Sequence, residues 1–151
     1  MKILCFVQYD EKINGVSKET IALSQELSDK TNGTFDIVTF SSEASEELKS
    51  FQSNQVIFVN NPNLIEYNPL FYTSCIEKVF NDGGYDILLI GHTYEARDWV
   101  PRLSARCDIP FISDCIDYSV ENESVEWTRS LYRAKINSKI KPISKRAIIS
   151  I

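Results

Sequence analysis

Four short apolar runs punctuate the first 90 residues of this chain, and they constrain its fold more than any other feature. They are residues 3–8 (ILCFVQ), 35–40 (FDIVTF), 56–59 (VIFV) and 87–90 (ILLI). Runs in which apolar residues dominate without alternating with polar ones are typical of strands buried on both faces of a parallel sheet. Helical patterns lie between them, so the sequence predicts a three-layer α/β fold in which right-handed crossovers build a mainly parallel sheet.

The helical stretches between these runs have recognisable ends. Ser17 is predicted to cap the first helix, which Asn32-Gly33 ends. A short polar helix is predicted at residues 44–51. Asn68 caps a third helix, with Pro69 at its first position.

The last third of the chain breaks this alternation. Residues 125–128, 131–136 and 147–151 have the composition of strands, and no helical pattern separates them. We therefore predict a C-terminal antiparallel extension on one edge of the main sheet. Because the chain ends on an apolar run, we also expect a domain cut from, or homologous to, something longer.

Length and charge narrow the classes of function. At 151 residues the chain is predicted to form a single domain spanning residues 1–151. A net charge of −5 argues against sequence-independent nucleic-acid binding, which needs a basic face. Residues 129–146 nevertheless carry seven lysines and arginines and no acid. This run is either a solvated hairpin face or a docking patch for an acidic partner.

The four cysteines are Cys5, Cys75, Cys107 and Cys115, and none forms a C-x-x-C pair. Their apolar surroundings predict buried free thiols and a reducing compartment. The first apolar run is too short for a signal peptide, and no stretch approaches the length of a membrane span. We therefore expect a cytoplasmic protein that contacts neither membrane nor nucleic acid.

The loop after the fourth apolar run lies where open α/β sheets bind ligands and partners, at the carboxyl ends of the strands. The loop at residues 9–15 is expected at the same edge. Pro101 would cost about 3 kcal/mol inside a helix, so we predict that the next helix begins near Asp98, with Asp98 as its cap. Val100, Leu103 and Cys107 would then face the core, and residues 92–97 would remain loop.

Few groups in this loop could perform chemistry. His92 is the only histidine of the chain, and such a residue is more often a hydrogen-bonded structural group than a base. Arg97 and Asp98 could form a local ion pair or hold a partner or an anionic ligand. Cys115 is the only thiol to consider beside His92 for Cys-His catalysis, and we expect a packed thiol.

Familiar ligand-binding motifs are absent from the sequence. The five glycines belong to no G-x-G-x-x-G or G-x-x-x-x-G-K-[ST] pattern, and no G-x-S-x-G elbow occurs. No C-x-x-C pair and no second histidine complete a zinc site. We expect no metal and no catalytic activity.

The segment from residue 91 to residue 114 contains an Arg-Asp pair, a Pro-Arg-Leu-Ser-Ala-Arg helix pattern and a Ser-Asp strand end. The residues of these motifs are Arg97, Asp98, Pro101, Arg102, Leu103, Ser104, Ala105, Arg106, Ser113 and Asp114. The segment resembles the alpha subunit of electron-transfer flavoproteins, which has a Gly-basic-Asp loop, a Pro-Arg-Leu-Ala-Ala-Arg helix and a Ser-Asp strand end. Arg129 and Tyr132 match a later Arg-Pro-Ile-Tyr-Ala-Gly-Asn-Ala strand, of which the Pro and the Gly-Asn are missing here.

The resemblance implies a Rossmann-like domain of the adenine nucleotide alpha hydrolase type that packs against a beta subunit. In that family the FAD is bound mainly by a separate C-terminal domain of the alpha subunit. FAD is therefore expected for the family, but its binding domain lies outside this chain. We expect either a truncated protein or a short stand-alone relative, with no flavin bound by this chain itself.

Two hypotheses about function follow, and a third is weaker. The first is a non-catalytic docking domain of flavin-linked electron transfer that binds a beta-like subunit or a second copy of itself. The expected contacts are Arg97, Asp98, Arg102, Arg129 and Tyr132. The alternative is a module that binds AMP, ATP or FAD. The residues expected to line that site are Gln8, Tyr9, Asp10, Gly91, His92 and Thr93. A small hydrolase or transferase that uses His92 is the weakest hypothesis.

Overall fold

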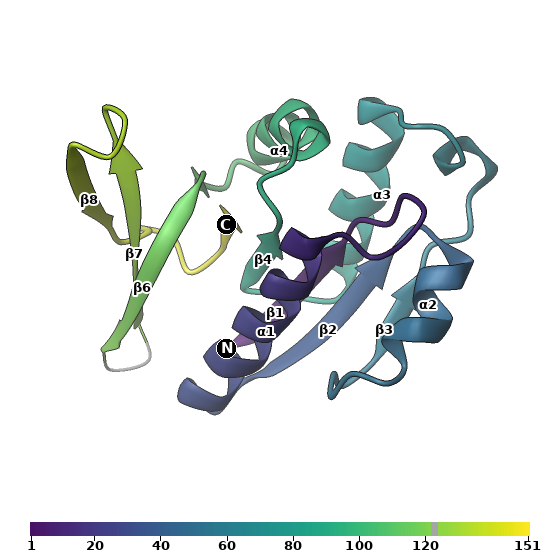
Figure 1. Cartoon of the computed structure of the whole chain (residues 1–151), viewed down its shortest axis with the longest axis horizontal. Helices are drawn as coiled ribbons and strands as arrows, with labels where there is room; N and C mark the ends of the chain where they lie inside the picture. Colours follow the sequence, from purple (N-terminus) through teal and green to yellow (C-terminus); the bar gives the residue numbers. More distant parts are fainter. Residues whose placement is uncertain (122–123) are drawn as a thin grey trace.

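The computed structural model describes residues 1–121 and 124–151 of the chain. Figure 1 shows a body of helices and strands, with a smaller sheet at one side. The elements in chain order are β1 (Lys2–Val7), α1 (Gly15–Lys30), β2 (Thr34–Thr39), α2 (Ser42–Leu48), β3 (Val56–Phe58), the 3-10 turn η1 (Pro62–Leu64), α3 (Pro69–Asp82), β4 (Ile87–Ile90), α4 (Tyr94–Cys107), β5 (Phe111–Ile112), β6 (Cys115–Glu121), β7 (Ser124–Leu131), β8 (Ile136–Ile140) and β9 (Ala147–Ser150).

The body is built around a six-stranded sheet with the order β3-β2-β1-β4-β9-β5. Its pairings are all parallel. The four apolar runs form β1 to β4, as predicted. β1, β2 and β4 are largely buried on both faces, whereas the edge strand β3 is only partly buried. The predicted α/β class, a mainly parallel sheet plus an antiparallel part, is confirmed.

Helices cover both faces of this sheet. On one face α1 and α2 pack through Ile21, Leu27 and Leu48 against one set of strand side chains. On the other face α3 and α4 pack against the alternate set, with Trp99 and Phe80 among the buried side chains. The result is the predicted three-layer arrangement. Within the described residues, no helix is both long and apolar enough to cross a membrane.

The smaller sheet, with the order β6-β7-β8, is antiparallel, and we call it the arm. It is a separate sheet that lies beside α1, on the same face of the body (Figure 1). Val125 and Trp127 of β7 enter the core on that face. The predicted extension on an edge of the main sheet is therefore wrong in its placement. The predicted strand at residues 131–136 is also wrong. It spans the hairpin turn between β7 and β8, where residues 132–134 have positive φ.

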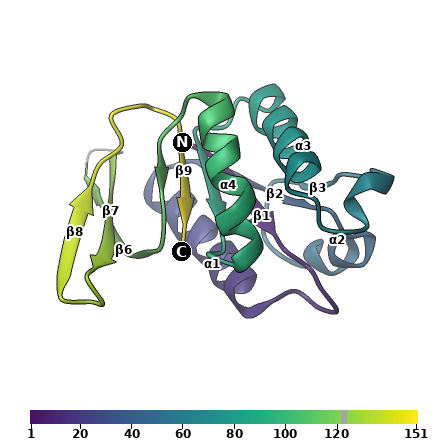
Figure 2. The ribbon, with the colours of Figure 1, turned by 90° about the horizontal axis from the view of Figure 1, so that it is seen from above.

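The final apolar run is a parallel strand, in contrast to the antiparallel strand that we predicted. β9 lies between β4 and β5, and Figure 2 shows it running through the body beside α4. Ala147, Ile148, Ile149 and Ser150 are all buried. A strand covered on both faces explains why this run is apolar except for Ser150.

Helix α4 begins four residues earlier than predicted. Thr93, and not Asp98, is its cap, because the Thr93 side chain accepts a hydrogen bond from the Ala96 N–H at 3.2 Å. The helix therefore contains Pro101 in its interior. Burial of Trp99 and other residues of α4 against the sheet offsets the loss of one backbone hydrogen bond. Cys107 is half-buried, whereas Val100 and Leu103 are buried as predicted.

Helix α1 also has a different cap from the one predicted. Asn14 is the cap, and its Oδ1 accepts a hydrogen bond from the Ser17 N–H at 2.7 Å. Ser17 is buried inside the first turn, where its Oγ accepts a hydrogen bond from the Gln8 N–H at 3.0 Å. Asn68 caps α3 and Pro69 follows it, as predicted.

A buried carboxylate joins the strands near the amino edge of the sheet. Asp36 of β2 is fully buried. Its oxygens accept hydrogen bonds from the Tyr85 hydroxyl at 2.6 Å and from the side-chain amides of Asn54 and Gln55 at 2.9 Å each. Lys2 Nζ lies 3.9 Å from the same carboxylate. Each oxygen thus has a partner, which is the condition for burying a charge.

Candidate functional site

The strand order reverses between β1 and β4, and in open α/β sheets ligands bind at such a point. Here the crevice is spanned by protein groups. Thr93 Oγ1 donates a hydrogen bond to Gln8 Oε1 at 2.8 Å. A Cβ added to Gly91 would lie 2.6 Å from Val16 Cγ1, so the first turn of α1 covers the backbone there. The structure thus brings Gln8 and Thr93 into direct contact, and Gly91 packs against Val16.

The cavity at this edge of the sheet lies to one side of the switch point, at the ends of β1, β2 and β3. It has a volume of about 640 Å³, and its lining includes Tyr9, Phe40 and Tyr72. Gln8, Tyr9 and Asp10 line this cavity, whereas Gly91, His92 and Thr93 do not. The predicted nucleotide-site residues are therefore divided between two places.

This cavity is acidic. Asp10, Glu11 and Glu43 line it, and its lining contains no lysine or arginine. Burial raises the pKa of Tyr72 to about 12, and the charges of Glu95 and Asp10 add to that rise. A negative potential repels phosphate groups.

The crevice at Gly91 and the cavity over β1, β2 and β3 do not fit the pyrophosphate of FAD or an adenine nucleotide. A phosphate cradle needs open backbone N–H groups or cations, but Gly91 is packed against Val16 and the adjoining cavity presents carboxylates. The described residues also contain no cluster of His, Cys, Asp and Glu that could hold a metal ion.

His92 lies on the other side of the switch point, where β4, β5 and β9 end. The backbone N–H of His92 donates a hydrogen bond to the backbone carbonyl of Ile151 at 2.7 Å. Its ring Nδ1 lies 2.8 Å from Ser150 Oγ, which also accepts a hydrogen bond from the Asp114 N–H at 3.0 Å. Burial lowers the pKa of His92. The charge of Asp114 opposes this effect, and those of Arg97 and Arg129 add to it. His92, which follows β4, is thus held by two hydrogen bonds to the end of β9.

Two arginines lie beside His92. Arg129 of β7 pairs with Cys115 of β6 in the arm, and Cys115 directly follows Asp114 in the sequence. Arg97 is in the first turn of α4, where its guanidinium lies 5.7 Å from the centre of the Tyr94 ring. We call His92, Arg97 and Arg129 the basic notch.

The predicted partner-binding residues separate into two groups. Arg97, Arg129 and Tyr132 lie on the side of the arm. Asp98 and Arg102 pair with each other at 3.1 Å, and Asp98 also accepts a hydrogen bond from Tyr67 at 2.8 Å. The local ion pair that we considered between Arg97 and Asp98 is thus replaced by one between Asp98 and Arg102.

The predicted burial of the four thiols is confirmed for Cys5 and Cys115, whereas Cys75 and Cys107 are only half-buried. Cys5 and Cys115 are buried, and burial raises the pKa of each to about 12. Cys115 Sγ donates a weak hydrogen bond to the carbonyl of Ile112 at 3.7 Å. A thiolate is the reactive form, so Cys115 is a packing residue beside the basic notch.

Sequence analysis missed Ser150 and the position of Asp114. Asp114 has a φ of 57°, which aspartate tolerates better than most residues. That strain bends the chain from β5 into the arm and aims its N–H at Ser150. The one available signal was a serine within an apolar run, which marks a polar contact inside a buried strand.

Comparison with known proteins identifies the family. The sequence profile described as Electron transfer flavoprotein domain matches residues 3–151 of the chain. The chain belongs to the electron transfer flavoprotein domain family. The resemblance carried by residues 97–114 is thereby confirmed.

Curated relatives of this electron transfer flavoprotein domain agree. Electron transfer flavoprotein subunit alpha of Bacillus subtilis is 32% identical over 91 residues, which cover 60% of this chain and 28% of that protein. The same subunit of Thermoanaerobacterium thermosaccharolyticum is 26% identical over 147 residues, covering 95% and 44%. Protein FixB of Clostridium saccharobutylicum is 27% identical over 137 residues, covering 88% and 41%. The chain therefore spans less than half the length of these relatives.

Proposed function

We propose that this chain is a non-catalytic assembly domain of flavin-linked electron transfer. It docks a beta-like subunit, or a second copy of itself, through the arm and the neighbouring first turn of α4. The observation that carries the proposal is the arm, a small sheet outside the main sheet whose hairpin end is basic and exposes apolar side chains.

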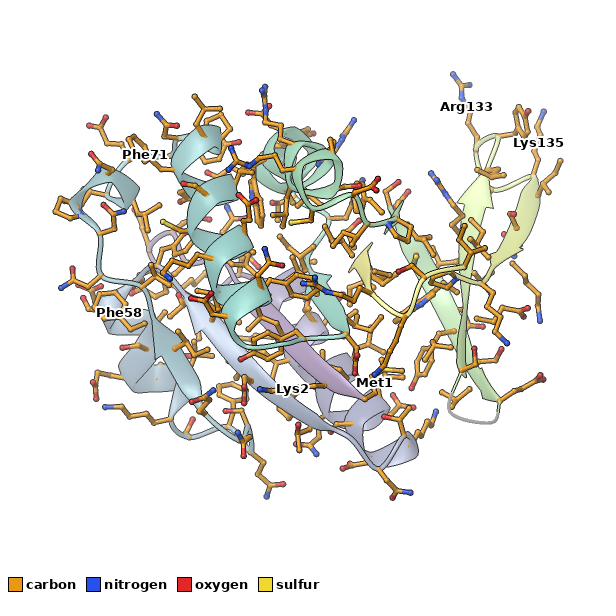
Figure 3. All side chains as sticks on the ribbon, turned by 180° about the vertical axis from the view of Figure 1, so that it is seen from behind. Met1, Lys2, Phe58, Phe71, Arg133 and Lys135 are labelled. Carbon is orange, nitrogen blue, oxygen red and sulfur yellow. The ribbon has the colours of Figure 1, made fainter. Side chains whose placement is uncertain are left out.

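Charge supports this surface. Residues 124–151 contain seven basic residues (Lys and Arg) and one acidic residue (Asp and Glu). Residues 1–123 contain nine basic and twenty acidic residues. Figure 3 shows Arg133 and Lys135 at the tip of the arm, at the opposite end of the molecule from Phe58 and Phe71. A basic projection on an acidic protein steers acidic partners toward one face.

Exposed apolar side chains support the same surface. Tyr132 at the hairpin turn is 75% exposed, Ile136 of β8 is 55% exposed, and Tyr94 at the start of α4 is 89% exposed. β8 is also an edge strand of the arm, with one side unpaired. Aromatic anchors beside arginines are the composition of protein interfaces, where a few such residues dominate the binding energy.

The test is the size of the particle in solution. Size-exclusion chromatography with light scattering should show a complex with the beta subunit of Bacillus subtilis electron transfer flavoprotein, or a dimer of the chain alone. Ile136→Asp should abolish the complex. Ile65→Asp, the same change at an 85% exposed position on the far end, should leave it intact. The proposal is refuted if the chain is a strict monomer both alone and in the presence of the beta subunit. A yellow colour of the purified chain would contradict the expectation that it binds no flavin.

A further inference from the structure

The basic notch gathers three hydrogen-bond donors from different elements, and no acidic side chain of the described residues pairs with them. His92 follows β4, Arg97 belongs to α4 and Arg129 belongs to β7 of the arm. Among the described residues, neither arginine forms an ion pair or a side-chain hydrogen bond. Asp114 is close enough to raise the pKa of His92, but it does not reach ion-pair distance of either arginine.

The hydrogen bonds around Ser150 define which ring nitrogen of His92 is free. Ser150 is fully buried, and its Oγ accepts a hydrogen bond from the Asp114 N–H. The only acceptor within reach of the Ser150 hydroxyl proton among the described residues is His92 Nδ1, at 2.8 Å. The ring proton of neutral His92 is therefore assigned to Nε2. His92 thus presents a donor away from Ser150.

Arg129 has a buried side-chain N–H group that lacks a hydrogen-bond acceptor. Its Nε is buried and has no hydrogen-bond partner in the structure, whereas the residue as a whole is only half-buried. A buried N–H without a partner costs about 1–3 kcal/mol, so such groups are rare unless a ligand completes them. A guanidinium fork matches the two oxygens of a carboxylate, and a histidine Nε2–H adds a third donor.

The surroundings favour a carboxylate that arrives on a protein. The notch lies beside the exposed Tyr94 ring and on the arm that carries Tyr132 and Ile136. These side chains offer contact area to a macromolecule, and the positive charge of the arm selects an acidic one.

We propose that the basic notch binds the carboxylate of an aspartate or glutamate side chain on the docked partner subunit. This inference rests on the proposed function for the identity of the partner, but the carboxylate chemistry of the notch can be tested on the chain alone.

The first experiment uses acetate as the probe and follows the His92 ring by NMR at constant ionic strength, with chloride as the reference anion. Acetate should raise the pKa of His92, because a bound anion stabilises the imidazolium, and it should shift the Arg129 Nε–H resonance. Arg129→Gln and Arg97→Gln should each weaken this response at least threefold. Lys12→Gln, which removes one charge from the exposed loop before α1, should leave it unchanged.

The second experiment measures binding of the Bacillus subtilis beta subunit. Arg129→Gln and Arg97→Gln should each weaken binding at least tenfold, with Lys12→Gln as the control for net charge. Arg97 is exposed, so its variant keeps the test valid if Arg129→Gln fails to fold.

The outcomes separate the two proposals. No response of His92 to acetate overturns the carboxylate site, as does a response to inorganic phosphate alone. Equal binding of the beta subunit by wild type and both variants overturns it as well. If acetate acts on the notch but neither the beta subunit nor a second copy binds, the proposed function fails and the anion chemistry stands.

Discussion

The body and the arm treat their buried polar groups in opposite ways. In the body, the fully buried carboxylate of Asp36 accepts hydrogen bonds from Tyr85, Asn54 and Gln55. In the arm, β7 holds every buried side-chain N or O atom that lacks a partner among the described residues: Trp127 Nε1, Arg129 Nε and Ser130 Oγ.

This difference indicates that the buried polar groups of the body are satisfied within the chain and that those of the arm are not. The body buries its sheet on both faces, whereas the arm rests on the body mainly through Val125, Trp127 and their neighbours. Cavities of about 430 and 400 Å³ border Trp127. A region with loose packing and unmet hydrogen bonds gains more from a partner than a region whose groups are already satisfied.

The largest expected effect comes from cutting the contact between the two regions. Trp127→Ala removes a side chain that is 1% exposed, which should lower the free energy of unfolding by about 3–5 kcal/mol. Hydrogen exchange should show that amides of β6 to β8 lose protection while those of β1 and β4 keep most of theirs. Equal loss in both regions would mean that arm and body unfold as one unit.

The next effect tests the completeness of the body. Asp36→Ala leaves the Tyr85 hydroxyl and two side-chain amides without their acceptor, and should lower the free energy of unfolding by about 3 kcal/mol. Asp29→Ala, at an exposed position of α1, is the matched control and should change it by less than about 0.5 kcal/mol. Urea denaturation measures both, and similar losses would contradict a structural role for Asp36.

A pair of hydroxyl deletions compares the two regions directly. Tyr85→Phe removes a hydroxyl that is bonded to Asp36 at 2.6 Å and should cost about 1–2 kcal/mol. Ser130→Ala removes a buried hydroxyl without a partner and should cost about 0 kcal/mol. Thermal unfolding of the two variants under one set of conditions decides the matter. A Ser130→Ala cost as large as that of Tyr85→Phe would show that the arm is satisfied after all.

The smallest effect is a pH dependence at the basic notch. The folded-state pKa of His92 is lowered by burial and by the two arginines, so the folded chain binds this proton less readily than the unfolded chain. The associated stability is complete above the unfolded-state pKa of about 6.5 and is lost as the pH falls through the folded-state pKa. Denaturation from pH 8 to pH 5 should show this slope, and Arg129→Gln should flatten it. An unchanged slope would mean that Arg129 lies too far from His92 to affect its pKa.

Much of the body could be predicted because its signals are local. The runs at residues 3–8 and 87–90 are apolar except for Gln8, as expected for strands covered on both faces. The predicted start of α4 was wrong because the cost of a proline was weighed without the gain from burying Trp99. β9 has the same continuous apolar pattern as β1, but its position between β4 and β5 depends on pairings that no sequence period records.

The basic notch was only partly predictable for the same reason. His92, Arg97 and Arg129 each attracted attention from their type and position. Their proximity depends on the turn at Asp114, which returns the chain from β5 into the arm and places Arg129 opposite Cys115. Positive φ at a non-glycine residue leaves little trace in a single sequence.

The late arrival of β9 has a consequence for biosynthesis. β5 pairs in the sheet with β9, and β9 separates it from β4. While the chain emerges from the ribosome, β1 to β4 can assemble as soon as they are made, and the arm hairpins can close locally. β5 must wait until residues 147–150 have been synthesised, so its flank stays open to chaperones or unwanted strand pairing until then.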